Sequence, residues 1–339
     1  MDTFFRNRHF ITTNDWTNQQ LDTVFEAAFD LKRRFAMGEP HRLLQDKTLF
    51  MMFFEQSTRT RNSMEAGMTQ LGGHAHDLTP DKMQLSHGES AKDTSIILSR
   101  MGHGISIRNC FYGIGNKYLN EVAKYASVPV MSLQDDIYHP FQGLADMMTL
   151  FEYFGRNLSG LKVTVSWAYA KSHAKPLSVP QTQLLLFPRF GIDLTVAHPK
   201  EFPLSKDIVE KAKFNARENG GSIRFTDNMD DAMKGAQVVV PKNWGGFAYY
   251  SEDDYLANEK NRVEEMSNNL EKYKDWIFDK RRVGLADKKV KMMHALPADR
   301  GREVTDEVID DPDISIVYDE AENRLHTAKA IMALTMGGR

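Results

Sequence analysis

A cluster of hydroxyl and guanidinium side chains lies directly behind an apolar run, in the stretch EQSTRTRNSME at residues 55–65. The preceding KTLFMMFF predicts a buried strand, and the following NSMEAGMTQLGG predicts a helix that ends at Gly72 and Gly73. Ser57 to Arg61 would then lie at the amino end of a helix, where backbone N–H groups and the helix dipole favour an anion. The hydroxyl and guanidinium donors suit phosphate. The alternative, left open by this stretch alone, is a solvated helix cap with surface arginines.

Polar residues of similar chemistry follow four further predicted strands. These are Arg108 after GISI, His139 and Gln142 after VPVMSL, Lys242 and Trp244 after QVVV, and His294 and Arg300 after VKMM. Ligands of open α/β sheets bind beyond the carboxyl ends of the strands, so this recurrence predicts binding sites there. Taken singly, each residue has a plain structural reading, such as a turn histidine for His139 before its proline.

Short apolar strands alternate with helical segments along the chain, which predicts an α/β fold with parallel sheets covered on both faces. The predicted strands are KTLFMMFF, HAHDL, GISIRN, VPVMSL, LKVTVSW, IDLTVAHP, SIRFT, QVVVPK and VKMMHALP. The first predicted helix spans residues 17–35, with Thr17 and Gln20 forming a capping box. The charged segment 251–276 predicts a solvated helical excursion. At 339 residues, two domains are expected, with a boundary near residues 150–160.

Composition argues against several classes of protein. Lys plus Arg number 43 against 46 for Asp plus Glu, and this balance gives no support for a surface that binds nucleic acid or membrane. The longest apolar runs are too short to cross a bilayer. The single cysteine, Cys110, excludes an intramolecular disulfide and fits a reducing compartment, so we expect a soluble cytoplasmic protein. The histidines show no metal-binding spacing, and YGIGNK lacks the third glycine of a dinucleotide loop. We therefore expect neither metal nor cofactor.

Four motifs, in order along the chain, resemble those of the aspartate/ornithine carbamoyltransferase superfamily. They are STRTR at 57–61, HPFQGLAD at 139–146, HALPADR at 294–300 and DEAENRLHTAKAIMA at 319–333. The resemblance implies a carbamoyl-phosphate-binding domain at residues 1–152, an acceptor-binding domain at 153–320, and a C-terminal helix at 321–339 that returns to the first domain. It also implies a homotrimer with shared active sites.

The resemblance assigns roles to individual residues. Carbamoyl phosphate would be bound by Ser57, Thr58, Arg59, Thr60, Arg108, His139, Gln142, Arg324 and the backbone carbonyl of Leu296. Thr58, Arg108, His139, Gln142 and Arg324 would also act on the carbamoyl group during catalysis. Gln84, with His87 beside it in MQLSHGE, would reach the site of a neighbouring subunit. The acceptor amine would attack directly, without a covalent enzyme intermediate, and positioning and electrostatics would supply most of the acceleration.

The acceptor region departs from the best-known members of the superfamily. Lys242 stands where ornithine enzymes carry an Asp, and Ala295 replaces the cysteine of their HCLP motif. The features WAY…KPL and KNW are similar to the knotted branch, which contains acylornithine carbamoyltransferases and transcarbamylases of unsettled acceptor. The resemblance therefore implies a trefoil knot near residues 170–270. Candidate acceptor-binding residues are Trp167, Lys175, Ser178, Lys242, Trp244, His294, Ala295 and Leu296.

A lysine at position 242 favours an acceptor with an anionic end, such as an N-blocked ornithine, over one with a free α-ammonium. Alternatives within the family are plain ornithine and the catabolic reaction, phosphorolysis of a ureido compound or oxamate. Two further alternatives are a regulatory protein that binds carbamoyl phosphate without turnover and an NAD-dependent dehydrogenase, whose GxGxxG turn is missing.

Overall fold

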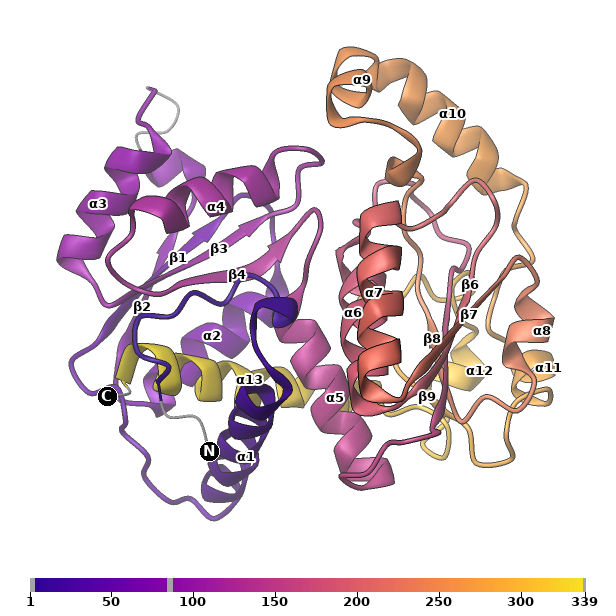
Figure 1. Cartoon of the computed structure of the whole chain (residues 1–339), viewed down its shortest axis with the longest axis horizontal. Coiled ribbons are helices and arrows are strands. Elements are labelled where there is room, and N and C mark those ends of the chain that lie inside the picture. Colours follow the sequence, from indigo (N-terminus) through magenta and orange to yellow (C-terminus); the bar gives the residue numbers. More distant parts are fainter. Residues whose placement is uncertain (1–3, 84–87, 338–339) are drawn as a thin grey trace. The chain divides into compact units, whose positions relative to one another are not determined.

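The computed structural model describes residues 4–83 and 88–337 (Figure 1). The chain divides into two compact units, Met1–Met148 with Glu322–Arg339, and Thr149–Ala321. The sequence analysis places these boundaries at 152/153 and 320/321. Helix α5 (Pro140–Phe154) carries the chain out of the first unit, and helix α13 (Val317–Met332) carries it back. In the described ranges, no helix is long and apolar enough to cross a membrane.

The first unit is built on a four-stranded parallel sheet in the order β2-β1-β3-β4. Its strands are β1 (Thr48–Phe53), β2 (His74–Leu78), β3 (Gly104–Asn109) and β4 (Val130–Asp135). Its helices, besides α5 and α13, are α1 (Asn18–Ala36), α2 (Thr58–Gln70), α3 (Ala91–Met101) and α4 (Gly115–Tyr125). Helices α3 and α4 lie on one face of the sheet, and α2 and α13 lie on the other (Figure 1).

The second unit is built on a five-stranded parallel sheet in the order β7-β6-β5-β8-β9. Its strands are β5 (Lys162–Ser166), β6 (Asp193–Ala197), β7 (Ser222–Thr226), β8 (Val238–Pro241) and β9 (Lys291–Met292). Its helices are α6 (Ser178–Leu186), α7 (Lys206–Asn219), α8 (Met229–Met233), α9 (Glu252–Ala257), α10 (Glu259–Glu271), α11 (Lys280–Val283) and α12 (Asp306–Ile309). Two parallel-sheet domains therefore confirm the predicted α/β class.

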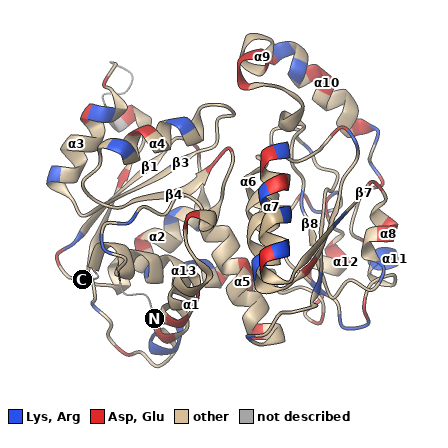
Figure 2. Cartoon of the chain, viewed as in Figure 1, with Lys and Arg blue, Asp and Glu red and all other residues tan. Residues whose placement is uncertain are grey.

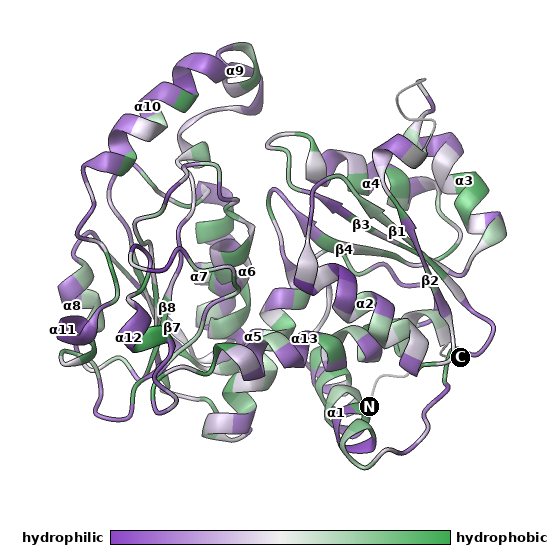
Figure 3. Cartoon of the chain, turned by 180° about the vertical axis from the view of Figure 1, so that it is seen from behind, coloured by the Kyte–Doolittle hydropathy of each residue, from purple (hydrophilic) through white to green (hydrophobic). Residues whose placement is uncertain are grey.

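Local sequence signals explain several of these elements. Helix α1 begins with the predicted capping box, in which Thr17 and Gln20 exchange side-chain and backbone hydrogen bonds. Helix α2 ends before Gly72, whose φ of 83° is a left-handed conformation that glycine adopts without strain. The buried strands β1 and β8 read as continuous apolar or small residues, as expected for strands covered on both faces. Strands β3 and β4 begin in the same way and end in polar residues, Arg108 and Asn109 in β3 and Gln134 and Asp135 in β4. Figure 3 shows the hydrophobic residues gathered on the strands and on the helix faces turned towards them.

Candidate active site

In the first unit, the carboxyl ends of β1 and β3 lie side by side. The strand order reverses between them, since β2 lies outside β1 and β4 lies outside β3. Phe53 at the end of β1 is paired with Arg108 near the end of β3. Ligands of open α/β sheets bind at such a reversal of strand order. The sheet therefore brings the start of the STRTR motif, Ser57, next to Arg108, which lies 51 residues later in the sequence.

The amino end of α2 presents donors towards this position. Ser57 is the N-cap residue, with extended backbone angles (φ −156°, ψ 119°), and its hydroxyl makes no capping hydrogen bond. The first backbone N–H groups of an α-helix have no partners within the helix, so they carry a partial positive charge at this end. The free cap hydroxyl and the first turn of α2 are thus suited to an anion.

Arg324 joins the last helix to two other elements of the same unit. The Nη2 group of this buried side chain donates to Thr60 Oγ1 at 2.6 Å, and its Nη1 group donates to Gln142 Oε1 at 3.1 Å. The side-chain amide of Gln142 in turn donates to Asp146 Oδ1 at 2.8 Å. These bonds bring together three predicted site residues from α2, α5 and α13.

The approach of α13 to α2 depends on Gly67. A Cβ atom at this position would lie 2.9 Å from Met332 Cε and 3.3 Å from Lys329 Cγ, both on α13. Glycine therefore lets the two helices pack closely enough for Arg324 to reach Thr60.

Arg108 is held by a neutral and an acidic neighbour. Its Nη1 group donates to Gln134 Oε1 on β4, and its Nε atom lies 3.9 Å from Glu55 Oε2. Glu55 also accepts a hydrogen bond from the Cys110 backbone N–H at 2.8 Å. Burial raises the pKa of Glu55, and the charge of Arg108 partly offsets this. Burial also raises the pKa of the Cys110 thiol, which disfavours the reactive thiolate form.

Arg59 and Arg61 have different roles although only two positions separate them. Arg61 forms an ion pair with Asp77 near the end of β2, and its guanidinium lies 4.3 Å from the centre of the Phe53 ring. Arg61 thereby connects α2 to the sheet. Arg59 is half-buried in the first turn of α2, which leaves it the better placed of the two for a ligand at the helix terminus.

Asp135 organises the turn that leads to His139, and the sequence analysis missed it. Its Oδ1 atom accepts from the N–H groups of Ile137 and Tyr138 at 2.8 and 2.7 Å, and its Oδ2 atom accepts from Ser132 Oγ at 2.9 Å. Burial raises the pKa of Asp135 to about 7. Aspartate often accepts from the backbone two residues ahead, so the Asp in QDDIYHP was a readable turn signal. The buried His139 then precedes Pro140, the first residue of α5.

In the second unit, the strand order reverses between β5 and β8. Ser166 is paired with Pro241 at their carboxyl ends, and β9 is the next strand after β8. The loops that follow these three strands contain Lys175, Lys242 and His294. The fold therefore gathers these predicted acceptor residues at one edge of the sheet.

The Glu303 cluster, defined as Lys175, Lys242, His294, Asp299 and Glu303, lies at this edge. Glu303 Oε2 accepts from Lys175 Nζ at 2.9 Å and from the Asp299 backbone N–H at 2.7 Å. Glu303 Oε1 accepts from the Asn243 backbone N–H at 2.7 Å and lies 3.8 Å from Lys242 Nζ. One fully buried carboxylate thus connects all three loops, and the sequence analysis did not find it.

The charges of this cluster cancel. Lys175 Nζ also lies 3.2 Å from Asp299 Oδ2, so two lysines face two carboxylates. The positive groups around Glu303 hold its pKa well below the usual range despite its burial. Burial lowers the pKa of His294 and so favours the neutral ring, although Glu303 beside it acts in the opposite direction. The HALPADRGRE stretch contained the signal, since its two acidic residues follow the same strand end as His294.

His294 has a defined tautomer. Its Nδ1 atom accepts from the Leu296 backbone N–H at 2.8 Å, so in the neutral ring the proton is on Nε2. Nε2 lies 3.3 Å from Glu303 Oε2. Leu296 has a φ of 49° and is followed by a cis peptide bond to Pro297.

Trp167, Trp244 and Ser178 are fully buried. The Trp167 indole N–H donates to the Trp244 carbonyl at 2.9 Å, and the Trp244 indole N–H donates to the Phe202 carbonyl at 2.8 Å. Trp167 also stacks on the Phe202 ring at 4.6 Å between centroids. These contacts favour a supporting role, in which the two tryptophans hold the loops after β5 and β8 together. Ala295, the small residue beside His294, is also buried.

The charged segment 251–276 forms α9 and α10, where acidic and basic residues alternate (Figure 2). Its prediction as a helical excursion is confirmed, but its polar groups are not all solvated. Tyr169 Oη donates to Glu271 Oε1 at 2.9 Å, and Ser267 Oγ lies 3.0 Å from His173 Nδ1. The segment therefore holds the loop that contains Lys175 from its outer side.

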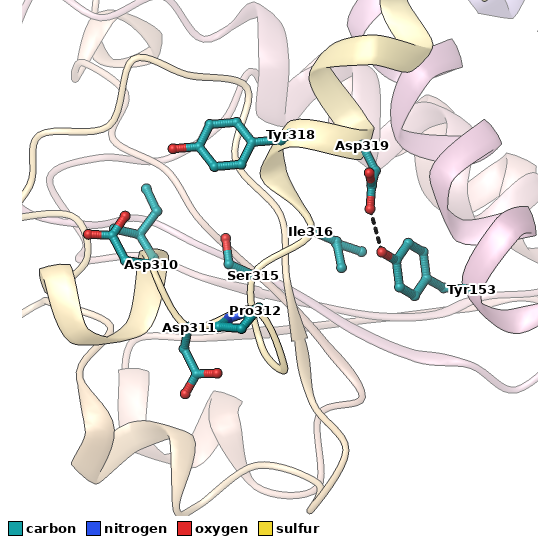
Figure 4. A pocket seen from close by; sticks show the side chains of 9 residues that line it. Tyr153, Asp310, Asp311, Pro312, Ser315, Ile316, Tyr318 and Asp319 are labelled. Atoms are coloured by element: carbon teal, nitrogen blue, oxygen red, sulfur yellow. Dashed lines mark hydrogen bonds between the residues drawn. The ribbon is translucent and has the colours of Figure 1, made fainter. Parts of the chain in front are cut away.

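A pocket of about 290 Å³ lies elsewhere in the second unit, between the end of α5 and residues 309–319 (Figure 4). Its acidic residues already have partners. Asp319 accepts from Tyr153 Oη, Asp310 is paired with Arg300, and Asp311 is paired with Lys280. The pocket contains none of the predicted site residues. Among the described residues there is also no group of three or more His, Cys, Asp or Glu placed to bind a metal ion.

Comparisons with known proteins agree with this geometry. Residues 8–152 match the carbamoyl-P binding domain of aspartate/ornithine carbamoyltransferases, and residues 175–335 match their Asp/Orn binding domain. The chain belongs to the aspartate/ornithine carbamoyltransferase family. It is a carbamoyltransferase, and the resemblance of its four motifs is confirmed. The carbamoyl-P binding domain covers most of the first unit, and the Asp/Orn binding domain covers most of the second unit together with residues 322–335, which fold with the first.

Relatives extend over nearly the full length of this carbamoyltransferase. Ornithine carbamoyltransferases of Pyrococcus abyssi and Thermococcus kodakarensis are each 38% identical to it, covering 98% of this chain and 97% of theirs. The solved ornithine carbamoyltransferase of Pyrococcus furiosus superimposes with a TM-score of 0.85 at 35% identity and covers 100% of both chains. Acetylornithine transcarbamylase in complex with acetylcitrulline gives a TM-score of 0.85 at 31% identity, covering 98% of this chain and 100% of the other. Both the ornithine and the acetylornithine branch are thus structural neighbours.

Gln84 and His87, predicted to act across a subunit boundary, lie outside the described residues.

Proposed function

We propose that this carbamoyltransferase moves the carbamoyl group of carbamoyl phosphate to the amine of an amino-acid-like metabolite with an anionic end. The observation that carries the donor assignment is the gathering of Arg324, Thr60 and Gln142 by hydrogen bonds in the same unit as the α2 terminus and Arg108. A solved variant of N-acetyl-L-ornithine transcarbamylase, similar in fold with a TM-score of 0.86, binds carbamyl phosphate and N-succinyl-L-norvaline.

In the proposed mechanism, Ser57, Arg59 and the first N–H groups of α2 bind the phosphate. Thr58, Arg108 and His139 stabilise the negative charge that develops on the carbonyl oxygen as the amine attacks. Gln142 and the Leu296 carbonyl orient the carbamoyl nitrogen. A nitrogen–carbon bond forms, the carbon–oxygen bond to phosphate breaks, and the departing phosphate takes the proton from the amine. The acceptor amine must therefore be uncharged when it attacks.

Lys175 and Lys242 are the donors that we assign to the anionic end of the acceptor. Both ammonium groups are largely buried, with side-chain exposures of 18% and 10%. A carboxylate that binds there would exchange water for charged N–H donors, a favourable hydrogen bond in a partly buried site. An N-acyl or N-succinyl ornithine fits this requirement, since its α-nitrogen carries no charge.

Ornithine itself is a second candidate. Two observations favour it, namely the ornithine carbamoyltransferases among the relatives and the neutral total charge of the Glu303 cluster. Because Glu303 and Asp299 offset the two lysines, the repulsion expected between Lys242 and a free α-ammonium is reduced.

The assembly and the chain path complete the proposal. We propose a homotrimer in which the loop with Gln84 and His87 enters the site of a neighbouring subunit, and a knot near residues 170–270. Size-exclusion chromatography with light scattering tests the trimer, since a monomeric but fully active enzyme would contradict shared sites.

The first experiment measures product formation from carbamoyl phosphate against a panel of acceptors. The panel contains ornithine, acetyl- and succinylornithine, lysine, putrescine, aspartate, diaminopropionate and oxamate. Turnover with an N-blocked ornithine and none with ornithine would support the leading candidate, and the reverse would select the second. If no acceptor is used, tight binding of a bisubstrate phosphonate would still show an intact donor site. Absence of phosphonate binding would instead support a protein without this activity.

A further inference from the structure

The buried carboxylate of Glu303 contacts the loops that follow β5, β8 and β9 in the second unit. Its two oxygens receive hydrogen bonds from Lys175 Nζ and from the backbone N–H groups of Asn243 and Asp299, at 2.7–2.9 Å. Lys242 Nζ and His294 Nε2 lie 3.8 and 3.3 Å away. A carboxylate has about four lone-pair directions, and these neighbours use them from several sides.

Burying a charged group in this way costs free energy of folding, so the arrangement calls for a functional reason. Burying a carboxylate is unfavourable, and a buried ion pair seldom gains more than well-packed apolar side chains would. Here the buried charge retains two lysines at the strand ends where the family binds its acceptor. Without it, the two ammonium groups would repel one another and turn outwards to water.

Glu303 also acts on the turn that contains Leu296. The Nε2 side of His294 faces Glu303, and its Nδ1 atom accepts from the Leu296 N–H at 2.8 Å. A second buried carboxylate, Glu320, accepts from the His294 backbone N–H at 2.7 Å. Glu303 therefore faces the imidazole of His294 and Glu320 holds the backbone of the same residue, while the ring accepts from the N–H of Leu296, whose φ is 49°.

We propose that Glu303 is the positioning residue of the acceptor half, which holds Lys175, Lys242 and the His294–Leu296 turn in the arrangement that binds the acceptor. This inference rests on the proposed function for its effect on turnover. The predicted effect on the reactivity of the two lysines is independent of the proposed function, because that reactivity can be measured without any acceptor. Glu303 itself is fully buried, and its contacts are with the two lysines, His294 and backbone N–H groups.

The test uses Glu303→Gln, which keeps the shape of the side chain and removes its charge, and Glu303→Asp, which keeps the charge on a shorter arm. Kinetics are measured with the acceptor that the wild type uses, together with the affinity of inorganic phosphate for the donor half. We expect Glu303→Gln to lower kcat/KM for the acceptor at least 100-fold, mainly through KM, while phosphate affinity stays within twofold. Glu303→Asp should recover at least tenfold of this loss.

An activity-independent measurement accompanies the kinetics. Competitive acetylation, read by peptide mass spectrometry, reports how readily each lysine amine reacts at neutral pH. Loss of the carboxylate should raise the reactivity of Lys175 and Lys242 at least fivefold, because their charged forms lose their partner. The exposed Lys200, whose side chain is 84% accessible, is the internal control and should not change.

Unchanged reactivity of both lysines in Glu303→Gln, or an acceptor kcat/KM within threefold of wild type, would overturn the proposal. If the wild type uses no acceptor, the function fails while the labelling still tests Glu303. If Glu303→Gln does not fold, the charge-balanced pair Glu303→Gln with Lys175→Met replaces it. Adding Glu303→Gln to Lys175→Met should lower kcat/KM much less than adding it to the wild type, because the effects of coupled residues are not additive. Full additivity would also overturn the proposal.

Discussion

The buried cationic side chains of the two halves of the enzyme have different kinds of partner. In the donor half, Arg324 and Arg108 donate to neutral groups, namely Thr60, Gln142 and Gln134, and Glu55 is the acidic neighbour of Arg108. In the acceptor half, Lys175 and Lys242 are matched by Glu303 and Asp299. The arginines of the donor half are thus held through side-chain oxygens of neutral residues, whereas the lysines of the acceptor half are held by carboxylates. An anionic end of the acceptor would therefore compete with Glu303 and Asp299 for the lysine donors.

The largest effect is expected from Arg59→Ala. Loss of a guanidinium that binds phosphate removes charged hydrogen bonds worth about 1.5–3 kcal/mol each. Donor affinity should fall on the order of 100- to 1000-fold, measured as phosphonate binding by calorimetry. Arg61→Ala is the matched control, because Arg61 pairs with Asp77 and packs on Phe53. Its affinity should fall by less than fivefold, and equal losses in both variants would contradict the separation of roles.

Lys242→Met tests the acceptor half by itself. Removing one ammonium donor should raise the KM for an anionic acceptor by about 30-fold, corresponding to about 2 kcal/mol for a charged hydrogen bond. The affinity for inorganic phosphate should stay unchanged, since Lys242 belongs to the other unit. Acceptor kinetics equal to wild type would remove Lys242 from the binding site. Lys242→Asp should be worse than Lys242→Met, because it places a second carboxylate near Glu303.

Thr60→Val tests the contribution of one hydroxyl group in the donor half. The change keeps the size of the side chain but leaves the Arg324 Nη2 group without the acceptor that lies 2.6 Å away. A buried donor that loses its partner costs about 1–3 kcal/mol. We expect about a tenfold loss of carbamoyl phosphate affinity and the same acceptor KM, measured by steady-state kinetics. A change in acceptor KM alone would mean that Arg324 serves the acceptor instead.

Lys329 extends the comparison to stability. This buried lysine of the first unit donates to neutral groups, Gln70 Oε1 at 2.8 Å and the Leu31 carbonyl at 3.5 Å, and lies 3.2 Å from His41 Nε2. Burial lowers its pKa to about 8. The unfolded chain binds a proton more tightly, since a free lysine has a pKa near 10.4, so the free energy of unfolding should rise from about pH 8 to pH 10.

Lys329→Met should flatten that rise by up to about 2 kcal/mol, measured by urea unfolding at both pH values. Activity should change little, because the residue lies outside both sites. An unchanged pH dependence in the variant would show that Lys329 is not the group responsible.

The amino-acid sequence by itself determined the strands, the α/β class and the position of the STRTR motif at the amino end of a helix. The residues proposed to bind phosphate there are consecutive, so strand–helix alternation was sufficient to place them together. Arg61 shows the limit even here, because its pairing with Asp77 depends on β2 being the neighbour of β1.

Only the tertiary structure decided the acceptor half. Glu303 lies 61 residues after Lys242 and 128 after Lys175, so its place after the same strand end as His294 is visible in the sequence but its pairing with these two lysines is not. Its role follows from the order of β5, β8 and β9, which brings three separate loops to one edge of the sheet. Ion pairing in a buried site depends on distances of a few ångströms, and the strand order sets these distances. The net charge of the acceptor site therefore became visible only in the folded chain. The same holds for how strongly Lys242 would repel a free α-ammonium.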